Sequence, residues 1–216
     1  MNILDDLFCK YGTDKSSKIN DFAGVYHAVL DPIRFEVRKV LEIGIFGTTP
    51  ENAGASLRAW AEYFPHALVY GVDLYDYSFL NNSRINTIVA DQGIIPGNLE
   101  RVVTTIGGDI DLIIDDGSHL MHHQQITLGY LFRYVKPGGY YIIEDLHTSY
   151  HAINNPTGTQ YNTMLMLEVL RHSGVILSDY ISEIDKQYIQ HWLASCEIHK
   201  IVPFASETSV LRKRLA

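Results

Sequence analysis

The sequence predicts an α/β fold in which a doubly wound, mostly parallel, seven-stranded sheet is covered by helices on both faces. Short aliphatic segments alternate with segments of helical spacing along most of the chain, and this alternation requires crossover connections between parallel strands. The aliphatic segments are continuous apolar runs, as burial on both faces requires. Acidic residues follow several of these runs, at the sheet edge where such folds bind ligands.

The strands and helices can be assigned in order along the chain. The expected strands are Lys39–Ile45, Leu68–Leu74, Ile85–Ala90, Asp111–Ile114, Tyr140–Ile143, Ile198–Pro203 and Ser209–Arg212. The expected helices are Ser56–Phe64, Asn98–Ile106, His122–Val135, Asn162–Ser173 and Asp179–Leu193. Leu57, Trp60 and Phe64 share one face of the first helix, and Gly107 with Gly108 closes the second.

The length and composition suit one domain with a sizeable core. We expect a single domain over 1–216, with an N-terminal cap segment (1–37), a ligand-binding core (38–146) and a C-terminal part (147–216) that carries a substrate loop.

The net charge of −8 argues against a nucleic-acid partner, and no apolar run is long enough to span a membrane. Met1–Lys10 lacks the features of a signal peptide. Two cysteines, Cys9 and Cys196, are too few for a disulfide framework, so a cytoplasmic location is expected.

Carboxylates follow five successive expected strands. They are Glu42, Asp73, Asp91, the pair Asp115 and Asp116, and the pair Glu144 and Asp145. A single acidic residue at such a position is weak evidence for a site. Packing alone does not produce five in a row, so this edge of the sheet is the candidate functional site.

The first strand ends in E-x-G-x-x-G, from Glu42 to Gly47, in which Gly44 lets the backbone approach a ligand closely. The motif lacks the opening glycine of the dinucleotide fingerprint, and no Gly-Lys-Ser/Thr follows it as in a phosphate loop. Asp73, at the end of the next strand, is placed to accept the hydroxyls of a ribose. Asp91 and Gln92 are placed to bond an adenine edge. The combination favours an adenosine ligand without phosphates, such as S-adenosylmethionine (SAM).

Several motifs carry a family resemblance. The order E-x-G, GVDL, ADQ, DLIIDD and KPGG over residues 38–146 resembles the Rossmann-like class I SAM-dependent methyltransferases. More narrowly, four segments resemble the metal-dependent macrolide sugar O-methyltransferases of the mycinamicin and macrocin type. They are YGTDK (11–15), SLRAWAEYFP (56–65), DDGSH (115–119) and IIEDLHTSY (142–150).

Asp116, Glu144 and Asp145 converge if their two strands are neighbours, and carboxylates so close need a compensating cation. Oxygen ligands select a hard ion such as Mg²⁺. The resemblance implies the same three ligands of Mg²⁺, with His119 as general base. A metal lowers the pKa of an acceptor hydroxyl, and a base typically contributes ~10²–10⁴-fold to the rate.

Further residues are expected around the cofactor and the substrate. The resemblance suggests that Tyr11 and Thr13 reach the methionine moiety of SAM, and Ser56 is expected near its carboxylate. Asp115 is grouped with the cofactor site, where it is expected to cap the following turn or bond backbone amides. His147 and His151 are candidates on the substrate side, and the loop from His151 to Tyr161 is interpreted as a lid or specificity loop.

The main prediction is a SAM- and Mg²⁺-dependent O-methyltransferase that acts on a hydroxyl of a sugar or polyketide-type small molecule. The resemblance also favours a homo-oligomer. Alternatives are a nitrogen or carbon acceptor, for example on an amino sugar, a hydroxylase-like relative from an antibiotic pathway, or a SAM-binding protein without catalysis. His119 and His123 also form H-x-x-x-H, a spacing that can bind Zn²⁺ on a helix face, although no third nitrogen or sulfur ligand is evident.

Overall fold

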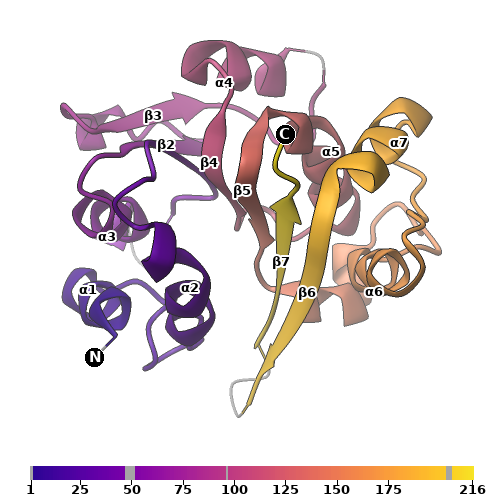
Figure 1. Ribbon diagram of the computed structural model, residues 1–216, viewed down its shortest axis with the longest axis horizontal. Helices are drawn as coiled ribbons and strands as arrows, with labels where there is room; N and C mark the ends of the chain where they lie inside the picture. Colours follow the sequence, from indigo (N-terminus) through magenta and orange to yellow (C-terminus); the bar gives the residue numbers. More distant parts are fainter. Residues whose placement is uncertain (1, 47–51, 96, 203–205) are drawn as a thin grey trace.

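A computed structural model describes residues 2–46, 52–95, 97–202 and 206–216. Its centre is a seven-stranded sheet in the order β3-β2-β1-β4-β5-β7-β6 (Figure 1). The first five strands pair in parallel, whereas β7 is antiparallel to β5 and β6. The strands are β1 (Lys39–Ile43), β2 (Leu68–Asp73), β3 (Ile85–Val89), β4 (Ile110–Asp115), β5 (Val135–Ile143), β6 (Leu193–Ile201) and β7 (Ser206–Lys213). The predicted doubly wound, mostly parallel sheet is confirmed.

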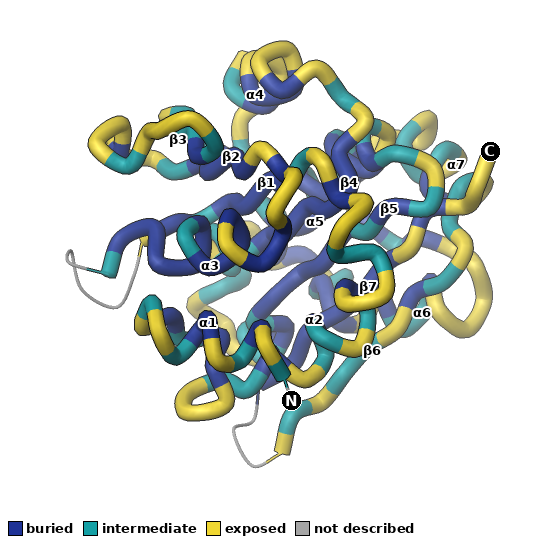
Figure 2. Tube along the Cα trace, turned by 60° about the vertical axis from the view of Figure 1, so that its left-hand side comes forward, coloured by how far each residue is buried: buried dark blue, intermediate teal, exposed yellow. Residues whose placement is uncertain are grey.

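Helices cover both faces of this sheet. They are α1 (Ile3–Tyr11), α2 (Ala23–Leu30), α3 (Ala55–Tyr63), α4 (Asn98–Ile106), α5 (Met121–Leu131), α6 (Thr163–Ser173) and α7 (Glu183–Trp192). Side chains of α1, α2 and α3 belong to one apolar core, and those of α4, α5, α6 and α7 to the other. Neighbouring strand residues alternate between the two: Val40 and Leu112 pack in the first core, and Leu41 and Ile113 in the second. Figure 2 shows the strands at the centre largely buried, with exposed residues on the outer side of α4.

The N-terminal segment contains two helices, α1 and α2, which the sequence pattern does not predict. Asn2 caps α1 by accepting a hydrogen bond from the Asp5 backbone nitrogen, and Gly12 ends the helix in the left-handed conformation, with φ 74°. Both are common helix-end signals. Leu4, Leu7 and Phe8 bury one face of α1.

The C-terminal elements have shifted boundaries. The last helix is shorter than predicted, because α7 starts at Glu183, and β6 starts at Leu193. Pro137-Gly138-Gly139 lies within β5, where the pairing moves from Ile110↔Val135 to Leu112↔Tyr140. The turn therefore forms a bulge inside the strand. Gly47 of the first motif and Pro203 of a predicted strand lie outside the described residues.

The strand order reverses between β1 and β4, whose carboxyl ends lie side by side with Ile43 opposite Asp115. This is the switch point at which open α/β sheets bind ligands. Within the described part of the chain, no helix is long and apolar enough to cross a membrane.

Candidate active site

A cavity of about 500 Å³ opens at the switch point. Its lining includes Gly44, Asp73, Asp91, Asp116, His119 and Asp145. These residues follow β1 to β5, so the parallel sheet brings together side chains that are up to about a hundred positions apart in the sequence. The cavity is large enough for a nucleoside-sized ligand.

Gly44 allows the loops after β1 and β4 to touch. Its φ is 82°, and a Cβ atom at this position would lie 2.0 Å from the carbonyl oxygen of Asp116. The Asp116 backbone nitrogen also donates to the Ile43 carbonyl at 2.9 Å. A side chain at position 44 would therefore displace the backbone that carries Asp116.

Asp73 and Asp91 border the cavity, as the sequence predicted for contacts with a nucleoside. Oδ2 of Asp73 accepts from the Ile45 backbone nitrogen at 3.0 Å, and Oδ1 accepts from that of Tyr75 at 3.2 Å. Oδ1 of Asp91 accepts from the Gly93 backbone nitrogen at 2.8 Å. The backbone amides fix the direction of both carboxylates.

Gln92 lines the cavity, while its amide group also bonds to buried neighbours, among them Asp115. Nε2 of Gln92 donates to Oδ1 of Asp115 at 3.0 Å and to Thr127 at 3.2 Å, and its Oε1 accepts from the Ser118 backbone nitrogen at 2.8 Å. Tyr141 donates to the other oxygen of Asp115. Burial raises the pKa of Asp115 to about 7, despite the hydrogen bond from Gln92. These two residues support the loop after β4.

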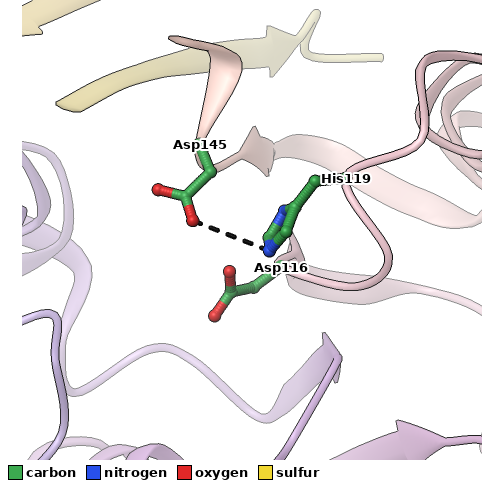
Figure 3. A group of neighbouring side chains, drawn as sticks. All are labelled: Asp116, His119 and Asp145. Atoms are coloured by element: carbon green, nitrogen blue, oxygen red, sulfur yellow. Dashed lines mark ion pairs between the residues drawn. The ribbon is translucent and has the colours of Figure 1, made fainter. Parts of the chain in front are cut away.

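Three side chains point toward one another above the ends of β4 and β5 (Figure 3). Asp116, His119 and Asp145 each offer a ligand atom, and these atoms lie within 4.8 Å of one another. Oδ1 of Asp145 is buried without a hydrogen-bond partner among the described residues. An unpaired carboxylate oxygen beside a second carboxylate fits a divalent cation. Burial raises the pKa of Asp116 to about 6, with the nearby charge of Lys15 opposing the rise.

Glu144 lies beside this group but faces the other way. Its Oε2 accepts from the ammonium of Lys15 at 2.8 Å, and Oε1 accepts from the Tyr26 hydroxyl. Burial raises the pKa of Glu144 well above its usual range, and the nearby charge of Asp116 adds to the rise. The sequence predicts Glu144 as a metal ligand beside Asp116 and Asp145, whereas the structure brings His119 to the other two instead.

Lys15 is a polar residue of the site that the sequence does not predict. Its Nζ atom lies 2.5 Å from Oδ2 of Asp116 and 3.4 Å from Oε1 of Glu42, and its side chain is 1% exposed. Burial lowers the pKa of Lys15, but the carboxylates of Asp116, Glu144 and Glu42 outweigh it and raise the pKa well above its usual range. The position of Lys15 within YGTDK was a signal, but a lysine between helices is usually solvated.

The other predicted cofactor residues fall into two groups. Thr13 and Ser56 line a small hollow beside Gly44, and the Ser56 hydroxyl donates to Oε2 of Glu42 at 2.7 Å. Burial raises the pKa of Glu42 to about 7, with Lys15 opposing the rise. Tyr11 instead donates its hydroxyl to Glu62 at 2.6 Å at the surface, so the structure does not bring it to the cavity.

The histidines separate into different environments. Nδ1 of His123 contacts the Ser118 hydroxyl at 2.8 Å, and His123 is not part of the three-residue group. A zinc pair of His119 and His123 therefore has no support in the described residues. His147 and His151 line a second cavity of about 370 Å³. Nδ1 of His147 lies 3.9 Å from Oδ1 of Asp145, a residue that lines the first cavity.

No family model matches the chain. Comparison with curated proteins, however, gives relatives that are all named as O-methyltransferases. The chain is 41% identical over 148 residues to demethylmacrocin O-methyltransferase of Streptomyces fradiae, covering 68% of this chain and 37% of that protein. It is 39% identical over 159 residues to L-olivosyl-oleandolide 3-O-methyltransferase of Streptomyces antibioticus, covering 73% and 41%. The chain thus spans about two fifths of the length of these curated relatives.

Solved structures agree with these matches. One of them is the MycE methyltransferase of mycinamycin biosynthesis, in complex with Mg, S-adenosylhomocysteine (SAH) and mycinamycin VI. It superposes with a TM-score of 0.80 at 28% sequence identity, and the match covers 98% of this chain and 54% of that one. An O-methyltransferase from Bacillus cereus in complex with SAH has a TM-score of 0.56 at 13% identity and shows the fold alone. The fold is that of the Rossmann-like class I methyltransferases. More narrowly, the chain is a homologue of the sugar O-methyltransferases of antibiotic and polyketide pathways.

Proposed function

We propose that this chain catalyses SAM- and Mg²⁺-dependent O-methylation of a sugar hydroxyl on a polyketide-type natural product. The observation that carries the proposal is the cluster of Asp116, His119 and Asp145 at the edge of a nucleoside-sized cavity. The names of the homologues support the acceptor class, and the Mg and SAH bound to MycE support the cofactors.

In this proposal the cofactor lies in the larger cavity. Asp73 would accept hydrogen bonds from the ribose hydroxyls, and Asp91 would face the adenine edge. The methionine end of SAM would extend toward the small hollow of Thr13, Gly44 and Ser56, which borders the larger cavity at Gly44 and Asp116. This placement directs the methyl group toward the cluster of Asp116, His119 and Asp145, because both cavities share Gly44 and Asp116.

Asp116, Glu144 and Asp145 are proposed to hold Mg²⁺, for which Glu144 must turn away from Lys15 and Tyr26. When bound, a divalent cation would lower the pKa of an acceptor hydroxyl. Nε2 of His119 would take the proton of that hydroxyl, at the moment when its oxygen receives the methyl group. Oδ2 of Asp145, 3.6 Å from Nε2 of His119, would stabilise the resulting imidazolium.

The acceptor is proposed to occupy the second cavity. Ile201 and Val202 line it together with polar and aromatic residues, which are His147, Tyr150, His151, Lys200, Ser206 and Glu207. This mixed lining suits a glycosylated macrocyclic or polycyclic molecule. The neighbouring loop from His151 to Tyr161, anchored where Asn154 donates to the His119 carbonyl at 3.2 Å, would then contribute to specificity.

The test is methyl transfer from isotope-labelled SAM to a panel of glycosylated macrolides and aromatic polyketides lacking one sugar O-methyl group. We expect a product methylated on oxygen, and loss of its formation when EDTA removes divalent ions. Methylation that is unaffected by EDTA, or that occurs on nitrogen, would contradict the proposal.

A further inference from the structure

A single buried ammonium group lies among the carboxylates of the site. Nζ of Lys15 contacts Asp116 at 2.5 Å, Glu144 at 2.8 Å and Glu42 at 3.4 Å. Among the described residues, no other cationic group forms an ion pair with any of these three carboxylates. Lys15 therefore supplies the positive charge that offsets them in this structure, since buried carboxylates without a counter-charge are strongly unfavourable.

Lys15 occupies one oxygen of each of two proposed metal ligands. Oδ2 of Asp116 and Oε2 of Glu144 both accept hydrogen bonds from Lys15, and a divalent ion held by Asp116 and Glu144 would share these carboxylates. The second oxygen of Glu144 accepts from Tyr26. An ammonium and a divalent cation on the same oxygens would repel each other at short range, so the two are alternatives.

We propose that Lys15 is a resident cation that competes with the divalent ion for Asp116 and Glu144 and thereby sets the metal affinity of the site. The inference rests on the proposed metal site. In the absence of metal, Lys15 keeps the carboxylates together and holds Glu144 turned toward α2. When a divalent ion binds, the ammonium gives up these oxygens and Glu144 becomes free to turn toward Asp145.

Replacement of Lys15 by a metal ion would also affect the segment between α1 and α2, which borders the cofactor cavity. Lys15 follows Asp14, which lines that cavity, and the Lys15 carbonyl accepts from the Ala23 backbone nitrogen at the start of α2. The Lys15 side chain thus joins the segment between α1 and α2 to the ends of β1, β4 and β5. Metal binding is therefore expected to change the contacts of this segment.

Calorimetric titration of MgCl₂ into metal-stripped wild type, Lys15→Met and Lys10→Met tests the competition. Lys10→Met is the matched control, because it removes one positive charge from the neighbouring helix, where Lys10 pairs with the exposed Glu62 at 2.6 Å. We expect Lys15→Met to bind Mg²⁺ about tenfold or more tightly than wild type, which corresponds to about 1.4 kcal/mol or more. Lys10→Met should match wild type. Equal or weaker binding by Lys15→Met would overturn the proposal.

Wild-type protein labelled with ¹⁵N-lysine gives a second measurement that needs no stable Lys15→Met variant. The buried Lys15 ammonium, assigned by its absence in Lys15→Arg, should shift or exchange faster with water as Mg²⁺ saturates the site. If Mg²⁺ binds while the Lys15 signal stays unchanged, the proposed competition by Lys15 is wrong, although the metal site itself stands. If neither wild type nor Lys15→Met binds Mg²⁺, with or without SAH, both the inference and the proposed metal site fail.

Discussion

Nε2 of His119 lies 3.6 Å from Oδ2 of Asp145, and both residues have left-handed backbones, with φ of 55° and 53°. Such a conformation is uncommon outside glycine and costs on the order of 1–3 kcal/mol per residue. Hydrogen bonds offset part of this cost: the Asp145 carbonyl accepts from the Thr148 backbone nitrogen at 3.0 Å, and Asn154 holds the His119 carbonyl. The backbone strain therefore coincides with the pair that we propose to carry the proton and to bind the metal.

Replacing His119 should reduce catalysis without loss of cofactor binding. Asparagine tolerates the left-handed conformation but cannot take up a proton at neutral pH, so we expect His119→Asn to lower kcat by about 10²–10⁴-fold. Calorimetry should give an unchanged Kd for SAH. His122→Asn is a control on the neighbouring helix α5. Similar kcat values for His119→Asn and wild type would exclude His119 as the base.

Gly44 is expected to be intolerant of even a methyl group. The new Cβ would meet the Asp116 carbonyl, and φ would remain in the left-handed region, so Gly44→Ala should lower the free energy of unfolding by about 2–4 kcal/mol. Gly24 lies in α2, and an added methyl group there has open space around it. Apart from the adjacent backbone of the same helix, no atom of the described residues lies within 4 Å of it. Gly24→Ala should therefore stabilise the protein by about 0.5–1 kcal/mol. Urea denaturation of both variants gives the comparison, and equal shifts would contradict the steric explanation.

Asp73 is expected to determine cofactor affinity. Asp73→Asn removes the charge that the ribose hydroxyls would bond, and a hydrogen bond to a charged group is worth roughly 1.5–3 kcal/mol. We therefore expect SAH to bind about 10–100-fold more weakly. The control is Asp76→Asn on the same loop. Oδ1 of Asp76 accepts from the Ser78 backbone nitrogen at 2.8 Å, and Asp76 does not line the cavity. Unchanged SAH binding by Asp73→Asn would remove Asp73 from the proposed cofactor site.

The sequence was sufficient for the sheet and for the edge where the site lies, because apolar periodicity and carboxylates at strand ends are local signals. It could not predict side-chain direction. Asp115 and Asp116 are adjacent, yet one supports Gln92 and the other faces the cavity. Lys15 was missed because its burial depends on carboxylates 27 to 129 positions away (42 − 15 and 144 − 15). Such pairing follows from tertiary packing alone.

The burial of Asp115 predicts a pH dependence of stability. Its pKa is raised to about 7 in the folded protein, so between about pH 4 and 7 the folded state holds a proton that the unfolded state releases. The stabilisation is complete below the unfolded pKa and is lost as pH rises toward 7. Asp115→Asn removes this group while keeping an oxygen that can accept from Gln92.

We expect the free energy of unfolding of wild type to fall relative to that of Asp115→Asn by up to about 1.4 kcal/mol per pH unit between pH 5 and 7. Urea denaturation of the two metal-free proteins at several pH values measures the difference, to which Glu42 contributes equally in both. Asp76→Asn is a control that should run parallel to wild type over this window, since the Ser78 backbone amide lowers the pKa of the exposed Asp76 and this carboxyl stays ionised in both states between about pH 5 and 7. Parallel curves for wild type and Asp115→Asn would show that Asp115 is ionised in the folded protein.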